Sequence, residues 1–226
     1  MITVFIGYDP REAIAYHVCA NSIIRHASQP VAIVPLALNL FKDYTEKHTD
    51  GSNQFIYSRF LVPHLMNYSG WAIFIDGDMI VRDDITKLWN LQDDSKDVLV
   101  VKHSYKTKMT KKYLGATNEN YPRKNWSSVI LWNCNSTVNH QLTPAFIEKS
   151  TGAELHRFTW IDDSNVGELP IEWNWLPDEY GENNTANLLH FTLGTPSFYD
   201  FATSPMATEW HRERIYTEYC QQRDIK

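Results

Sequence analysis

Short apolar strands alternate with helices through the first hundred residues, and this alternation constrains the fold more than any other feature. ITVFIG at 2–7 is a β-branched run that predicts a buried strand. VAIVPLAL at 31–38 predicts a second strand, at a sheet edge because Pro35 has no N–H to donate. WAIFI at 71–75 predicts a third strand. Strands that alternate with helices in this way predict an α/β fold with a mostly parallel sheet.

The helix after the first strand has a clear start signal. Asp9 is expected to be the N-cap, Pro10 the first helical residue and Glu12 the third, which together form a capping box. This helix is expected to continue to about His26. The remaining predicted elements are a helix at 53–66 disturbed at Pro63, short helices at 83–89 and 143–149, strands at 97–101, 128–133, 169–177 and 187–192, and a final helix at 204–222.

The composition is that of an ordinary globular chain. Of the 226 residues, 43% are apolar and 21% are charged, and no repeat or Gly/Ser linker divides them. We therefore predict one domain over 1–226. The net charge of -6 argues against general nucleic-acid binding, which needs a basic surface. The lysine-rich stretch 102–112 is the local exception, and is either a solvated loop or a mobile loop that meets an anionic ligand.

The cysteines and the hydropathy bear on location. Cys19, Cys134 and Cys220 are far apart and odd in number, which fits neither a metal finger nor a disulfide framework. No apolar run reaches the length of about 18 residues that a membrane span needs. The N-terminus is strand-like and does not resemble a signal peptide. These features predict a cytoplasmic protein with reduced thiols and no transmembrane segment.

Two acids follow the most apolar strand. Asp76 and Asp78 flank Gly77, and alternate residues of a strand point to the same face. Two carboxylates this close repel each other, and burying either is unfavourable without a partner. Magnesium or manganese would remove both problems, because these ions prefer oxygen ligands. The alternative is a solvated turn, since Asp-Gly is a common hairpin dipeptide.

The run IFIDGDMIV at 73–81 resembles the Asp-x-Asp strand of nucleotide-sugar-dependent glycosyltransferases of family 8, which includes glycogenin and bacterial lipooligosaccharide galactosyltransferases. Other segments resemble that family in the same order, from Ile2 to about Phe198. They are YSRFLVPHL at 57–65, ITKLWNL at 85–91, SVILWN at 128–133, LPIEWNWLP at 169–177 and LLHFTLGTPSF at 188–198. The resemblance implies a GT-A fold, a single Rossmann-like nucleotide-binding domain with a mixed, mostly parallel central sheet. Residues 1–100 would then bind the nucleotide sugar, and 101–226 would bind the acceptor and carry out catalysis.

The resemblance also implies a metal site. Asp78 would be a direct ligand, Asp76 would contact both the metal and the ribose, and His190 would be the third protein ligand. An imidazole ligand favours manganese over magnesium. Without the resemblance, a lone histidine is as readily structural as functional.

Donor contacts follow from the same comparison. Arg59 would reach the donor sugar or diphosphate and take part in catalysis, although a surface helix arginine is the plain alternative. Tyr8, Asp9 and Arg11 fall in the first strand-to-helix loop, where the family holds the nucleotide base and ribose. Helix capping fully explains Asp9, but capping and nucleotide binding can coexist through different atoms. The residues implied in nucleotide-sugar binding are Gly7, Tyr8, Asp9, Arg11, Arg59, Ile75, Asp76, Gly77 and Gly194.

Two acids in WIDDSN, Asp162 and Asp163, match the position of the family's acid near the transferred sugar. Their alternative role is to begin a helix, because acids are common in a first turn. Trp173 and Trp175 would share one face of a strand, where core packing is favoured over stacking on an acceptor sugar.

The chain departs from the family at two places. The family's His-x-x-Gly-x-x-Lys appears here as HFTLGTPSF, with Gly194 one place later and no lysine. The donor diphosphate must lose that contact or take it from elsewhere, and the stretch 102–112 could supply it. The segment Trp126-Ser127-Ser128 replaces the family's Asn-Ala-Gly, so no donor sugar is assigned.

The function implied is transfer of a hexose from a nucleoside diphosphate sugar to an acceptor hydroxyl, with metal assistance and retention of configuration. Uracil is the implied base, with guanine open, and the acceptor would be a glycan, a lipid-linked sugar or a protein. One alternative is a sugar-nucleotide pyrophosphorylase, which the glycine-poor GYDPREA disfavours. The other is a catalytically silent nucleotide-sugar-binding module, which the altered HFTLGTPSF permits.

Overall fold

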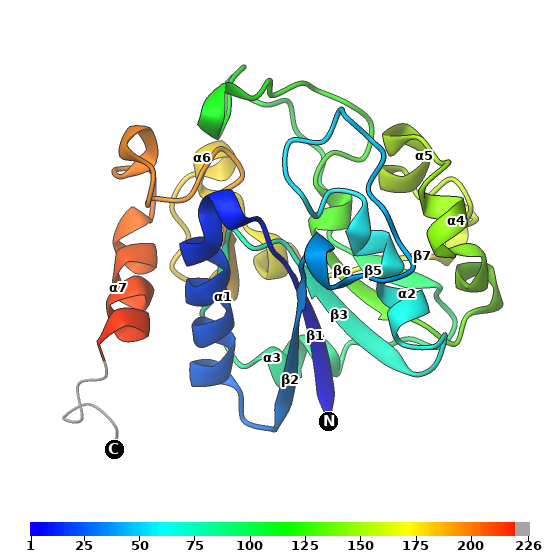
Figure 1. The fold of residues 1–226 in the computed structure, drawn as a ribbon. Helices are drawn as coiled ribbons and strands as arrows, with labels where there is room; N and C mark the ends of the chain where they lie inside the picture. Colours follow the sequence, from blue (N-terminus) through cyan, green and yellow to red (C-terminus); the bar gives the residue numbers. More distant parts are fainter. Residues whose placement is uncertain (220–226) are drawn as a thin grey trace.

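The computed structural model describes residues 1–219, so Cys220 and the end of the predicted final helix lie outside the described residues. Figure 1 shows the chain as a ribbon. The strands are β1 (Ile2–Gly7), β2 (Val31–Leu36), β3 (Trp71–Ile75), β4 (Met79–Val81), β5 (Val98–Val100), β6 (Val129–Asn133), β7 (Val166–Glu168) and β8 (Leu188–His190). The α-helices are α1 (Ala13–His26), α2 (Val62–Leu65), α3 (Ile85–Trp89), α4 (Pro144–Ile147), α5 (Gly152–His156), α6 (Pro177–Tyr180) and α7 (Ala207–Glu218).

Six strands form the central sheet, in the order β2-β1-β3-β6-β5-β7. β1 is parallel to both β2 and β3, and β5 is parallel to β7, whereas β6 is antiparallel to both of its neighbours. The sheet is therefore mixed and mostly parallel, as predicted, and Pro35 lies in the edge strand β2. A second, two-stranded sheet pairs β4 with β8 in antiparallel fashion.

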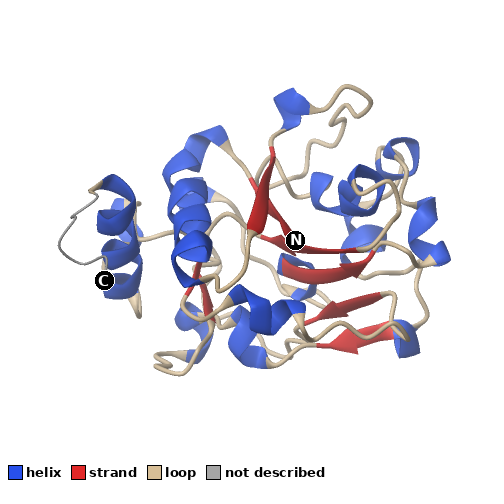
Figure 2. Cartoon of the chain, turned by 90° about the horizontal axis from the view of Figure 1, so that it is seen from below, coloured by secondary structure: helices blue, strands red, loops and turns tan. Residues whose placement is uncertain are grey.

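The central sheet is covered on both faces. Alternate residues of β3 divide between two apolar cores, so that Phe74 faces one side while Ile73 and Ile75 face the other. The Phe74 side is packed by α2, α4 and α5, and the opposite side by α1 and α3. Figure 2 shows helices on both sides of the strands. Burial on both faces explains why β3 is continuously apolar and does not alternate.

The second sheet lies beside α1. Ile80 of β4 and Leu189 of β8 share an apolar cluster with Val18 of α1 and Trp210 of α7. α7 also packs along α1, as the red and blue helices of Figure 1 show. Ser22 of α1 accepts a hydrogen bond from the Val81 N–H at 2.9 Å, which fixes β4 against the helix. These contacts place the end of β8 next to the end of β3.

Three predicted local structures are wrong. LPIEWNWLP is not a strand, because Ile171–Asn174 forms a 3₁₀-helix. Pro63 does not disturb a long helix; it lies in the first turn of α2, after a 3₁₀-helix over Ser58–Leu61. The capping box is absent, because the Glu12 side chain accepts a hydrogen bond from the Tyr113 hydroxyl at 2.7 Å. Asp9 does cap the chain at this point, as the N-cap of a short 3₁₀-helix that precedes α1.

Candidate functional site

Asp76, Gly77 and Asp78 form the bend between β3 and β4, which belong to different sheets. The two carboxylates converge because the chain turns here, and not because they alternate within one strand. Backbone hydrogen bonds fix both acids: Asp76 N–H donates to Ser128 O at 3.0 Å, and Asp78 O accepts from Phe191 N–H at 3.1 Å. The acids therefore do lie in a turn, as the Asp-Gly dipeptide indicates, and this turn directly follows the end of β3.

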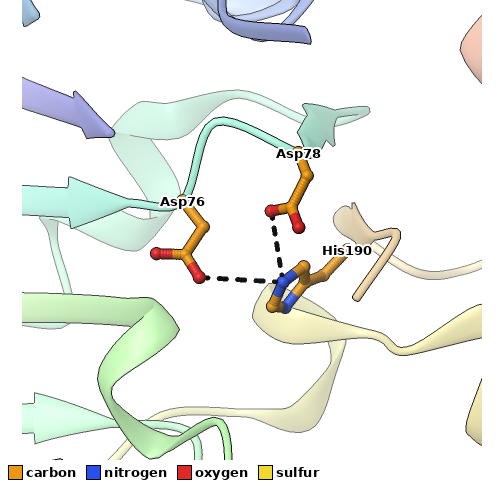
Figure 3. A group of neighbouring side chains, drawn as sticks. All are labelled: Asp76, Asp78 and His190. Carbon is orange, nitrogen blue, oxygen red and sulfur yellow. Dashed lines mark ion pairs between the residues drawn. The ribbon is translucent and has the colours of Figure 1, made fainter. Parts of the chain in front are cut away.

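His190 completes a cluster with the two acids, as Figure 3 shows. It is the last residue of β8, whose register sets it opposite Met79, the residue after Asp78. Its Nε2 lies 3.3 Å from Asp78 Oδ1 and 3.8 Å from Asp76 Oδ2. One possible ligand atom from each of the three residues lies within 4.8 Å of the others. These three side chains can hold a divalent cation.

The hydrogen bonding of the cluster fits a cation. His190 is 2% exposed and Asp76 is 7% exposed. Oδ1 of Asp78 is buried and receives no hydrogen bond. Buried carboxylate oxygens without donors are unfavourable, and a hard cation supplies the missing interaction.

Arg59 is the positive charge next to this cluster. Its Nη1 lies 2.8 Å from Asp76 Oδ1 as an ion pair, and also donates to the Ser127 carbonyl at 2.8 Å. The guanidinium is buried beside the Phe74 ring. Burial raises the pKa of Asp76 to about 6, and Arg59 opposes that rise. The predicted surface-helix alternative for Arg59 is therefore wrong.

Asn174 is a residue of the candidate site that the sequence motifs did not indicate. Its Oδ1 accepts from His190 Nδ1 at 2.9 Å, because its amide group already donates to Ser128 Oγ at 2.8 Å and to Asn125 O at 3.2 Å. With Nδ1 protonated, the lone pair of His190 lies on Nε2, on the side of the acids. The Trp-Asn pair of LPIEWNWLP resembles the family's late motif, but nothing in the neighbouring sequence indicates a role for its asparagine.

The loop after β1 holds the predicted base and ribose residues. The Asp9 carboxylate accepts from Arg11 N–H at 2.9 Å, from Arg11 Nη2 at 2.6 Å and from Gln54 N–H at 3.1 Å. Burial raises the pKa of Asp9, but these hydrogen bonds outweigh it and hold the pKa below its usual range. Tyr8 is half-buried, and its ring lies edge-on to Tyr16. Asp9 therefore organises this loop.

The three remaining donor-site candidates are a buried residue and two glycines. Ile75 is fully buried in the core beneath α1, so only its backbone is near the acids. Gly7 lies under the Phe55 ring, where a Cβ atom would be 2.3 Å from that ring. Gly194 has a φ of +154°, which favours glycine, and it lies between Tyr113 and Phe201. These positions are set by close packing.

Asp162 and Asp163 are not brought to the cluster. They precede β7. The carbonyl of Asn165, which follows them, accepts a hydrogen bond from Asp97 N–H at 3.0 Å. This hydrogen bond lies at the end of the sheet where β3 begins. Asp76 follows the opposite end of β3. Both aspartates are exposed, and Asp163 pairs with Arg123.

The two tryptophans lie in the interior. Trp173 is in the 3₁₀-helix over Ile171–Asn174 and is buried in the core shared with α1. The Trp175 indole N–H donates to Gly181 O at 2.8 Å, and the ring packs on Tyr180. The predicted shared strand face is absent, and the core alternative is confirmed for Trp173.

Glu12 is a buried acid that sequence analysis treated only as a cap. It is 6% exposed, and its Oε2 has no hydrogen-bond partner. Burial and the nearby Asp78 raise the pKa of Glu12 to about 8. Oε1 of Glu12 accepts a hydrogen bond from the Tyr113 hydroxyl. This hydrogen bond connects the end of the lysine-rich stretch 102–112 to the start of α1.

The architecture is that of known glycosyltransferases. The structure of the galactosyltransferase LgtC with donor and acceptor sugar analogues has a TM-score of 0.62 at 11% identity, over 98% of both chains. The bifunctional glycosyltransferase WbbM has a TM-score of 0.61 at 19% identity. That match covers 94% of this chain, which spans 51% of the WbbM chain. The fold is therefore the GT-A fold of these enzymes.

The sequence comparisons give the family. The model described as glycosyl transferase family 8 matches residues 21–195. Protein CDI of Arabidopsis thaliana is 39% identical over 219 residues, which are 93% of this chain and 85% of that protein. The chain therefore belongs to glycosyl transferase family 8. No helix within residues 1–219 is both long enough and apolar enough to cross a membrane.

Proposed function

We propose that the chain is a manganese-dependent hexosyltransferase that uses a nucleoside diphosphate sugar, with uracil as the base. It would transfer the sugar to a hydroxyl of a glycan, lipid or protein acceptor and retain the anomeric configuration. Residues 1–100 supply Asp76 and Asp78, and 101–226 supply His190. The expected division was a nucleotide-sugar half and an acceptor and catalytic half, and the donor site would take residues from both.

The observation that carries the proposal is the convergence of Asp76, Asp78 and His190, with a buried oxygen of Asp78 that lacks a donor. The imidazole in this set supports manganese over magnesium. The chemistry such a cation supplies is neutralisation of the charge that develops on the departing diphosphate.

The chain's own residues would orient the donor. Arg59 is buried and fixed by Asp76 and Ser127, so its charge is preorganised beside the cluster. The loop organised by Asp9 would receive the base and ribose. A cavity of about 330 Å³ lies next to this loop and is lined in part by Arg11, Gly51 and Gln54.

Retention has two possible routes. A covalent intermediate needs a carboxylate at the anomeric carbon. Asp162 and Asp163 are exposed and are not part of the cluster, which supports attack on the same face as the departing diphosphate.

The test is calorimetric binding of uridine and guanosine diphosphate sugars to the full chain, with manganese and then with a chelator. Three proteins are compared: wild type, Asp78→Asn, and the control Asp93→Asn, which changes an exposed aspartate in a surface turn. We expect manganese-dependent binding of a uridine diphosphate sugar by wild type and control, and its loss in Asp78→Asn. Binding that is indifferent to metal and to Asp78→Asn would refute the proposal.

A second readout separates the enzyme from a silent binding module. Release of the nucleoside diphosphate from the bound donor, to water or to added acceptors, is followed over time. Turnover that manganese stimulates supports the transferase. Tight donor binding without turnover on any acceptor would support the silent module.

A further inference from the structure

The lysine-rich region is folded against the candidate site. Tyr113, which directly follows the stretch 102–112, donates its backbone N–H to Leu193 O at 2.6 Å and its hydroxyl to Glu12 at 2.7 Å. Its ring packs on Phe198. Lys112, the preceding residue, donates its own N–H to Ala116 O at 2.8 Å. The backbone at Lys112 is therefore held between the start of α1 and the segment after His190.

The ammonium of Lys112 lies in the field of the acid pair. Asp78 and Asp76 raise the pKa of Lys112 and Arg59 lowers it, so these three charged groups are close enough to act on its ammonium. Lys112 is half-buried, and within residues 1–219 no ion pair joins it to an acid. Burial lowers its pKa, and the two aspartates oppose that effect. An ammonium held here without a direct partner is available to an anionic ligand.

The other lysines of the region are placed differently. Lys106, Lys108 and Lys111 are exposed. Lys102 lies over the Trp126 ring. Lys124, farther along, is buried and already donates to Asn118 Oδ1 at 2.8 Å and to Glu119 O at 2.7 Å.

Arg59 and Lys112 are the two cationic side chains that act on the acid pair. Nη1 of Arg59 is engaged by Asp76 and Ser127. The segment from His190 to Phe198 contains no lysine or arginine. A compact ammonium on a flexible stem suits a phosphate oxygen as a point charge.

We propose that Lys112 binds the diphosphate of the donor and holds it beside Asp76, Asp78 and His190. The inference rests on the proposed function and adds a residue to it. Lys112 would stabilise the diphosphate both in the bound donor and as a leaving group.

The test measures three affinities of the full chain by calorimetry: for Mn²⁺ alone, for inorganic pyrophosphate with Mn²⁺, and for uridine diphosphate with Mn²⁺. Pyrophosphate removes any dependence on the identity of the base. The variants are Lys112→Met, Lys112→Arg and the matched control Lys111→Met, which neutralises the exposed neighbour. Lys112→Gln is a second neutral variant, and thermal unfolding confirms that each protein is folded.

Lys112→Met is expected to weaken pyrophosphate and uridine diphosphate binding about tenfold or more, the usual effect of losing a charge-assisted hydrogen bond. Its Mn²⁺ affinity should be unchanged or higher, because a nearby positive charge is removed. Lys112→Arg should recover most of the binding, and Lys111→Met should stay within about twofold of wild type.

Equal diphosphate binding by wild type and Lys112→Met would overturn the inference, while manganese-dependent donor binding left the proposed function intact. An equal loss in Lys111→Met would also overturn it, because the effect would then be that of the loop's general charge. A wild type that binds neither probe with Mn²⁺ would remove the proposed function, and the role of Lys112 with it.

Discussion

Gly77 lies directly against the carbonyl of Gly7, so that a Cβ atom on Gly77 would be 2.4 Å from that oxygen. The ends of β1 and β3 can approach this closely only because Gly77 has no side chain. The contact sets the path of the bend that carries Asp76 and Asp78.

Gly77→Ala should therefore disturb both stability and the acid pair. We expect a loss of about 1–3 kcal/mol, typical of overpacking, and weaker Mn²⁺ binding. Denaturant unfolding and Mn²⁺ titration measure the two effects. The control is Gly152→Ala, whose Cβ would meet only the end of the Tyr57 side chain at 3.0 Å. A Gly77→Ala protein as stable as wild type would show that this approach is not rigid.

Asn174→Leu should weaken Mn²⁺ binding about 10–100-fold, because the hydrogen bond that fixes the His190 ring is lost. Asn174→Asp should retain more affinity, since it keeps an acceptor for His190 Nδ1–H. Electron paramagnetic resonance of free Mn²⁺ gives the affinities, and exposed Asn184→Leu is the control. Equal affinities for Asn174→Leu and Asn174→Asp would contradict a positioning role.

The stability of the metal-free chain should fall as pH rises. Folding raises the pKa of Asp76 to about 6 and that of Glu12 to about 8, so the folded chain binds more protons than the unfolded chain between about pH 4 and 8. Glu12→Gln should raise stability at pH 8 by about 1–3 kcal/mol and flatten the slope from pH 5 to 8. Denaturant unfolding with a chelator measures this, with exposed Glu168→Gln as the control. An unchanged slope in Glu12→Gln would contradict the assignment.

Asp162→Asn and Asp163→Asn should each keep donor turnover within about threefold of wild type, because both acids are exposed and neither belongs to the cluster. Asp163→Asn also loses its pair with Arg123, which is worth about 0–1 kcal/mol at the surface. Release of nucleoside diphosphate measures turnover. A hundredfold fall in either variant, at unchanged donor affinity, would mean that this acid reaches the reacting atoms.

Sequence patterns correctly predicted the elements that depend on interactions between residues close in the chain. The strands β1 and β3 and the end of α1 at His26 follow from apolar runs and helix signals. The family resemblance supplied the grouping of His190 with the acids. Composition alone could not have done so, because β8 is far from β3 in the chain.

The errors occur where distant residues override a local pattern. Glu12 has the spacing of a capping box, but Tyr113 binds its carboxylate. Trp173 and Trp175 alternate as in a strand, yet prolines bound the segment and the Asn174 side chain is held by His190 and Ser128. Neither partner can be identified from the neighbouring sequence.

The pairing of β4 with β8 fixes when the site can exist during synthesis. His190 enters the cluster only after β8 has left the ribosome and docked on β4, long after Asp76 and Asp78 have been made. A nascent chain or a truncated fragment would hold two repelling acids without their third partner. A cation bound by all three residues would stabilise only the completed fold by mass action. Cation binding would therefore report that β8 has docked on β4.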